Sequence, residues 1–127
     1  PKAQYFAKVL ASGGFDTSFY LLGWTPGSLD SWNVLTNLHG CRDDKGKGGA
    51  FNLGGYCNPA VDALSARVLV ENDPATRLDL IEQAYKITTD EIAYIPLHQQ
   101  GLAWGVSSKI ELVQRADNQL MLYYVKK

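Results

Sequence analysis

The stretch FDTSFYLLGWTPGSLDSW, residues 15–32, decides the fold predicted for this chain. Its first part, residues 15–22, is an aromatic and aliphatic run with the length and composition of a buried strand. The run stops at Gly23 and Trp24, and the following residues 25–28, TPGS, predict a turn because they cannot continue a sheet. Ligand crevices in open α/β sheets lie just beyond strand ends. The stretch therefore predicts an enclosed binding site, without an obvious reactive group, beside Trp24.

The composition of the whole chain is that of one folded domain, residues 1–127. A chain of this length buries about two-thirds of the surface that it exposes when unfolded. The net charge of −1 gives no electrostatic reason to expect nucleic acid or an anionic membrane as a partner. No apolar run approaches the roughly 20 residues that a membrane span requires. Because the sequence opens PKAQY, without an initiator Met or a signal peptide, we expect a piece of a longer protein whose export signal lies upstream.

The chain has two cysteines, Cys41 and Cys57, which flank a segment rich in glycine and charge. A disulfide across that segment would stabilise the fold by about 3 kcal/mol in the chain-entropy model. The alternative is two unrelated buried thiols. Zinc is disfavoured because only His39 lies close by and four ligands are normally needed. The spacing favours the disulfide, which would place the protein in an oxidising compartment.

Four helices are predicted from apolar periodicity and from capping residues. Residues 2–11 form the first, which Gly13-Gly14 ends, and Ser28 or Asp30 caps a short second helix that ends at Gly40. Asn58-Pro59 and Asp73-Pro74 begin the other two, since each pairs a side-chain cap with a proline at the first helical position. The apolar stripes predicted to be buried are Val61, Leu64, Val68 and Leu69 in the third helix, and Leu78, Ile81, Ala84, Tyr85 and Thr88 in the fourth, which runs to about Asp90.

Short apolar runs at residues 94–97, 102–106 and 119–125 predict further strands, the first of them irregular because of Pro96. With the strand at residues 15–22, they give a mixed α/β or α+β domain, in which a mixed sheet is flanked by helices. The two helices that begin with Asn-Pro and Asp-Pro are expected to pack against one face of the sheet.

The residues that could carry chemistry have structural alternatives. For Trp32 and Trp104, a place in the core is favoured over a role as a platform for a ligand. Asp30 is a helix cap or a carboxylate that binds a cation. His39 either interacts with the last carbonyls or the dipole at a helix end, or contacts the ligand. His98 is predicted to be packed and hydrogen-bonded.

An enzyme would need a nucleophile, a base and an orienting group. Cys57 with His98 and an aspartate is the one conceivable set, and a disulfide would remove its thiol. The sequence contains no GxSxG, Walker, HExxH or dinucleotide motif. We therefore predict a protein that is not an enzyme and has no catalytic residues, cofactor or metal site.

Four motifs, in order, resemble the C-terminal part of the extracytoplasmic solute-binding proteins of family 5. They are YFAKVLASGGFDTSFYLLGW (residues 5–24), the pair Cys41 and Cys57, YCNPAVDAL (56–64), and DPATRLDLIEQAYKITTDEIAYIPLHQQ (73–100). Proteins of this family deliver dipeptides, oligopeptides, nickel chelates, haem, glutathione and related compounds to ABC importers. The resemblance covers nearly the whole chain, and it rests on the order and spacing of the motifs together.

The resemblance implies a type II periplasmic binding fold, in which two lobes close on a ligand and this chain forms most of the C-terminal lobe. It also implies a periplasmic location, an ABC permease in the inner membrane as partner, and a disulfide between Cys41 and Cys57, which recurs in the dipeptide-binding branch. The loop after Gly-Trp lines the cleft in such proteins. The candidate ligand-binding residues are accordingly Trp24, Thr25, Pro26 and Gly27, with Asp30 and Trp32 beside them.

One position departs from the family pattern. Peptide binders of the family commonly have Asp three residues after the Trp, where it pairs with the α-ammonium of the peptide, and this chain has Gly27 there. Asp30 is the nearest carboxylate, so either it replaces that anchor or the ligand has no free amine at this place. The resemblance as a whole implies capture of a small peptide or peptide-like solute.

The alternatives are a metal-chelate binding protein, a hydrolase, and a stand-alone protein-interaction module whose surface includes Trp32, Trp104 and Tyr123-Tyr124. A lobe taken alone exposes its cleft face, so self-association through that face is also expected.

Overall fold

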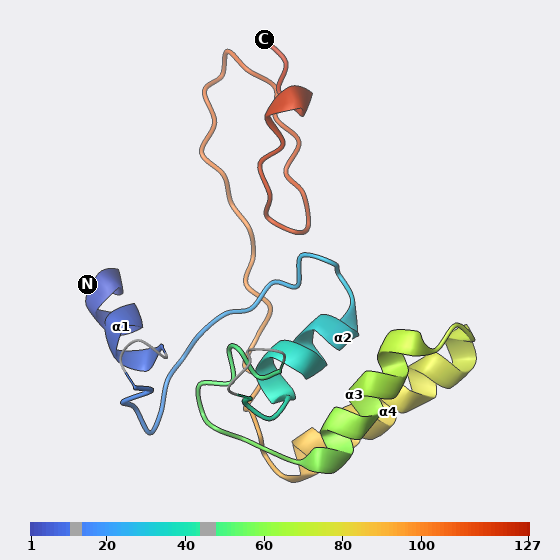
Figure 1. The fold of residues 1–127 in the computed structure, drawn as a ribbon. Coiled ribbons are helices and arrows are strands. Elements are labelled where there is room, and N and C mark those ends of the chain that lie inside the picture. The colour runs from blue at the N-terminus through green and yellow to red at the C-terminus, as the bar shows by residue number, and fades with distance from the viewer. Residues whose placement is uncertain (11–13, 44–47) are drawn as a thin grey trace.

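The computed structural model describes residues 1–10, 14–43 and 48–127, and its regular elements are helices (Figure 1). α3 and α4 form an antiparallel helical pair, with α2 beside them. α1 lies apart from these helices, and the C-terminal segment extends away from them. The elements are α1 (Lys2–Val9), α2 (Ser31–Val34), the π-helical turn η2 (Leu35–His39), α3 (Pro59–Val70), α4 (Pro74–Asp90) and the 3₁₀ turn η3 (Leu122–Tyr124).

α3 and α4 begin where the sequence predicts, because each has a side-chain cap followed by proline. The Ala60 amide donates to Asn58 Oδ1 at 2.9 Å, and the Thr76 amide donates to Asp73 Oδ2 at 2.7 Å. Each cap accepts a hydrogen bond from an amide that has no partner within its helix. The proline at the first helical position has no amide hydrogen, so it adds no further donor without a partner. The predictions of both helices are confirmed.

The core lies where α3 and α4 meet η2. Buried residues from these three elements form one apolar cluster, and Trp32 packs against it. Leu80 is buried, whereas Leu69 and Leu78, which were predicted to be buried, are 59% and 55% exposed. Ala84 and Thr88 are buried, and Ile81 and Tyr85 pack against the core, so the predicted stripe of α4 holds except at Leu78. The cluster consists of Leu35, Leu64, Val68, Leu80 and Ala84.

The short helix predicted before the cysteines is also present. Asp30 caps it, α2 continues directly into η2, and Gly40 ends it in an extended conformation. The sequence gives no signal for the π-helical turn. Such turns are rare and often occur at functional sites.

The predicted mixed sheet is wrong. Among the described residues there is no strand, and one isolated antiparallel bridge joins Glu111 to Lys126. No segment of the described chain pairs with residues 15–22 in a ladder, and Phe19 and Leu21 are 81% and 68% exposed. The runs at residues 94–97, 102–106 and 119–125 are likewise unpaired, and η3 occupies part of the last. A strand needs a hydrogen-bonded neighbour, so the type II sheet architecture is absent from the described chain.

The end of the first helix is described only in part. α1 ends at Val9, with Leu10 as its extended cap, and Gly14 has a left-handed φ of 71°. Gly13 of the predicted Gly13-Gly14 stop, and residues 44–47 of the cysteine loop, lie outside the described residues. None of the described helices combines the length and the apolar character that crossing a membrane would need.

Candidate functional site

A cavity of about 420 Å³ lies beside Trp24. It opens between the extended segment that leads to Trp24 and the segment that follows α4. The cysteine loop closes it with Phe51 and Gly54. Its wall consists of residues 18–24, residues 92–95 and 97, and Leu38, Phe51 and Gly54.

Trp24 is half-buried and held on two sides. Its Nε1–H donates to Asn33 Oδ1 at 2.9 Å, which ties the indole edge to α2. Its ring packs against Phe51, with the ring centroids 4.8 Å apart and the planes tilted by 52°. A large aromatic wall with a fixed orientation suits the recognition of an apolar or aromatic ligand group.

The turn predicted after Trp24 is present, because the Leu29 amide donates to Pro26 O at 3.0 Å. Thr25 and Gly27 are exposed and Pro26 is half-buried. None of these three residues belongs to the cavity wall as the described residues form it. Among the sequence-predicted ligand residues, the structure places Trp24 at the cavity.

Asp30 has two partners within the chain. Its Oδ1 accepts from the Trp32 amide at 2.7 Å, as the helix cap, and from Arg77 Nη2 at 3.0 Å. Arg77 Nε also donates to Val68 O at 3.1 Å, which fixes the guanidinium. The hydrogen bond from Arg77 is the main cause that holds the pKa of Asp30 below its ordinary value. The carboxylate therefore caps α2 and pairs with a cation of α4.

Trp32 lies away from the cavity of Trp24. It packs against the core cluster and lines a second hollow of about 360 Å³, which it shares with Cys41 and Asp62. Its predicted core role is confirmed, and the structure does not bring it together with Trp24 in one wall.

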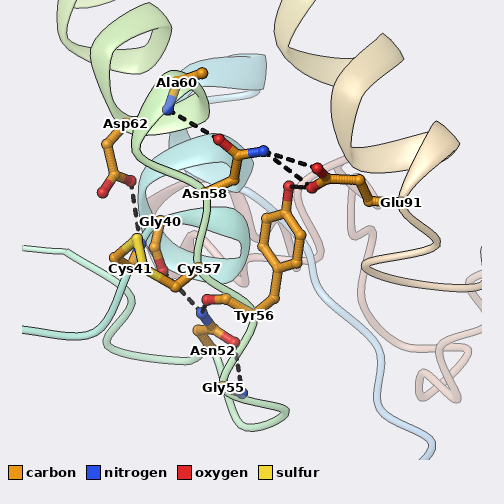
Figure 2. The surroundings of a disulfide bond; sticks show 10 residues. All are labelled: Gly40, Cys41, Asn52, Gly55, Tyr56, Cys57, Asn58, Ala60, Asp62 and Glu91. Atoms are coloured by element: carbon orange, nitrogen blue, oxygen red, sulfur yellow. Dashed lines mark hydrogen bonds between the residues drawn. A yellow bond between two sulfur atoms is a disulfide. The ribbon is translucent and has the colours of Figure 1, made fainter.

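Cys41 and Cys57 form a disulfide, as predicted (Figure 2). The Cys41 amide donates to Asp62 Oδ1 at 3.0 Å, so α3 holds one end of the bridge. Inside the loop, Asn52 is fully buried. Its Nδ2 donates to Gly40 O at 2.8 Å and to the carbonyl of Tyr56 at 2.5 Å. The bridge and this amide together position the loop that carries Phe51.

A second cluster joins the loop to the end of α4 (Figure 2). Glu91 accepts from Tyr56 Oη at 2.5 Å and from Asn58 Nδ2 at 2.9 Å. Burial, followed by the bond to Glu91, raises the pKa of Tyr56 to about 12, and the Tyr56 bond holds the pKa of Glu91 below its ordinary value. Sequence analysis missed Phe51, Asn52 and Glu91. The cysteine pair and the Asn-Pro cap mark this region in the sequence, but neither indicates a role for these three residues.

His39, the last residue of η2, is 8% exposed and lies between two tyrosines. Its ring stacks on Tyr94, with centroids 5.0 Å apart, and meets Tyr85 edge-on at 5.7 Å. Among the described residues nothing forms a hydrogen bond with its Nδ1. Burial lowers the pKa of His39 from its ordinary value of 6.5. His98 is exposed, so the packed role predicted for it is wrong.

Acidification is expected to destabilise the protein through His39. The pKa of His39 is lower in the folded protein than in the unfolded chain, so the unfolded chain takes up the proton first as the pH falls. The contribution of neutral His39 to the free energy of unfolding is therefore complete above pH 6.5 and is lost as the pH falls through the folded pKa. Urea unfolding followed between pH 7.5 and 5 measures this loss. His39→Phe should remove it and His98→Phe should keep it; an unchanged loss in His39→Phe would contradict the assignment.

The described residues contain no group of three or more His, Cys, Asp or Glu side chains that could hold a metal ion. The arrangement around Trp24 is that of a cavity with an aromatic wall, to which the disulfide-bonded loop contributes Phe51 and Gly54.

Comparisons with known proteins find relatives among mycobacterial lipoproteins. The chain is 29% identical over 108 residues to an uncharacterized lipoprotein of Mycobacterium tuberculosis, and the match covers 85% of this chain and 19% of the relative. It is 33% identical over 72 residues to an uncharacterized lipoprotein of Mycobacterium bovis, which covers 57% of this chain and 13% of that protein. No protein-family model matches the chain, and no solved structure gives a significant match. The chain thus resembles a limited part, about a fifth at most, of much longer lipoproteins.

Proposed function

We propose that this chain is part of an extracytoplasmic solute-binding protein that captures a small peptide or peptide-like solute for an ABC importer and catalyses no reaction. The cavity walled by Trp24 and Phe51 is the observation that carries the proposal. Its volume of about 420 Å³ lies in the lower part of the roughly 300–1,000 Å³ typical of small-molecule sites. Such a volume suits a solute of about the size of a dipeptide.

The resemblance to the family 5 solute-binding proteins supports this function. The first motif ends at Trp24, which lies in the cavity wall. The cysteine pair forms the disulfide that closes the loop carrying Phe51. Because the chain matches 19% of the length of a relative, we propose that the rest of a longer protein covers the open side of the cavity. Closure of that part over the solute would desolvate it against the aromatic wall.

The relatives are lipoproteins by name, which supports an extracytoplasmic, membrane-anchored location for the whole protein. We propose the periplasm, with an export signal upstream and an ABC permease of the inner membrane as partner. The disulfide agrees with this location, since such bonds persist in oxidising compartments.

Replacing Trp24 is expected to weaken solute binding at least about tenfold, because large aromatic anchors carry a major share of binding energy. The measurement is isothermal titration of the full-length protein with individual dipeptides and opines, followed by Trp24→Ala with the compound that binds best. Absence of binding by the unaltered protein to every compound would contradict the proposed function.

Trp104→Ala is the matched control for this substitution. Trp104 is also half-buried and its Nε1–H also donates to an asparagine, Asn118 Oδ1, at 2.7 Å, but it is not part of the cavity wall. Its replacement should leave the affinity unchanged. Equal losses in the two variants would attribute the effect to general damage instead of the cavity.

A further inference from the structure

The wall of the cavity is free of formal charge at neutral pH. Among the described residues that form it, none is Asp, Glu, Lys, Arg or His. The polar side-chain groups of the described wall are hydroxyls and the Trp24 indole N–H, which donates to Asn33. The Tyr94 hydroxyl donates to Leu38 O at 2.7 Å. Burial raises the pKa of Tyr94, so this hydroxyl stays neutral. The remaining wall is aliphatic, aromatic or backbone.

Asp30, the carboxylate nearest to Trp24 in the sequence, and Glu91 already have partners. Asp30 caps α2 and pairs with Arg77. Glu91, directly before the wall residues 92–95, accepts from Tyr56 and Asn58. Neither carboxylate belongs to the cavity wall, and each is already paired with donors of this chain, so neither is placed to hold a ligand amine in the cavity.

A buried ammonium needs a counter-charge, because an ion transferred from water without one loses its hydration uncompensated. Building on the proposed function, we propose that the cavity accepts an uncharged apolar or aromatic group of a peptide-like solute whose amine is acylated or otherwise blocked. Trp24 and Phe51 contact that group across their ring faces. The Tyr94 hydroxyl, whose proton is donated to Leu38 O, can accept a hydrogen bond from an amide N–H, and backbone groups of the wall offer others.

Three synthetic probes test this on the full-length protein by isothermal titration: N-acetyl-leucyl-phenylalanine amide, free leucyl-phenylalanine, and N-acetyl-seryl-asparagine amide. We expect the first to bind at least about tenfold more tightly than either of the others. Equal or tighter binding of the free dipeptide would overturn the inference while leaving peptide capture intact. Equal binding of the polar blocked probe would overturn the preference for an apolar group. Failure of all three, and of the dipeptides and opines above, would contradict the proposed function and the inference with it.

A pair of variants tests the role of charge in the wall. Ala93 is half-buried and lines the cavity. Ala93→Asp should reduce the preference for the blocked probe at least about threefold, because the new carboxylate can pair with the ammonium of the free dipeptide. Ala93→Asn is the control and should not reduce the preference in this way, because its side chain has nearly the same size and no charge. Thermal unfolding of both variants checks that they fold. The same preference in the two variants would overturn the electrostatic argument, and the comparison of probes on the unaltered protein decides the inference if either variant does not fold.

Discussion

Reduction of the Cys41–Cys57 disulfide is expected to lower the free energy of unfolding by about 3 kcal/mol. The bridge joins residues 16 apart in the sequence, so it removes much of the freedom that the unfolded loop would have. Urea unfolding with and without a phosphine reductant measures the difference. Equal midpoints after complete reduction, verified by thiol titration, would contradict the prediction.

Loss of the bridge should also loosen the cavity wall. The closed loop carries Phe51, whose ring packs against Trp24. Once the loop is open, the Trp24 indole should become more accessible. Acrylamide quenching of the tryptophan fluorescence below the unfolding transition can follow this, with Trp24→Ala giving the part that comes from the other tryptophans. The double variant Cys41→Ala/Cys57→Ala is the control, because its stability and quenching should not respond to reductant. A response in that variant would show that the reductant acts elsewhere.

The helices could be predicted because the signals that begin them are local. Asn58-Pro59 and Asp73-Pro74 place a cap acceptor within three residues of the amide that it satisfies. Asp30 does the same for α2. Such bonds depend on a few neighbouring residues, so the sequence alone indicates where these helices start.

The strands could not be predicted in this way, since a strand is stable only beside a partner that is distant in sequence. The apolar run around Phe19 has strand composition, yet among the described residues no segment pairs with it. Apolar composition therefore indicated a buried strand, whereas in the described structure Phe19 and Leu21 of this run are exposed.

The candidate site likewise has a part that local sequence indicates and a part that depends on distant residues. Trp24 follows from its place before a turn, and its position in the cavity wall agrees with that reasoning. The contact with Phe51 and the Asp30–Arg77 pair, 47 residues apart, depend on tertiary packing. The sequence leaves open whether Asp30 caps a helix or binds a cation. In the structure it caps α2 and also pairs with the cation of Arg77.

Replacing Asn52 with leucine is expected to lower the free energy of unfolding by about 3 kcal/mol. Asn52 is fully buried, and it bonds three backbone groups of its own loop. Its Nδ2 donates to Gly40 O and Tyr56 O, and its Oδ1 accepts from the Gly55 amide at 3.0 Å. Leucine has a similar size but no polar atom, so it leaves these groups without their partner, and each costs roughly 1–3 kcal/mol when it stays buried.

Asn72→Leu provides the matched control. Asn72 is exposed, and its Nδ2 makes one long bond, 3.4 Å, to Val70 O. The same chemical change there should alter the free energy of unfolding by no more than about 0.5 kcal/mol. Urea unfolding of both variants under oxidising conditions separates the buried bonds from the general effect of exchanging asparagine for leucine. Similar small losses in both would mean that water replaces Asn52 as the partner of these groups, and that the disulfide with the Asp62 and Glu91 contacts is enough to fix the loop that carries Phe51.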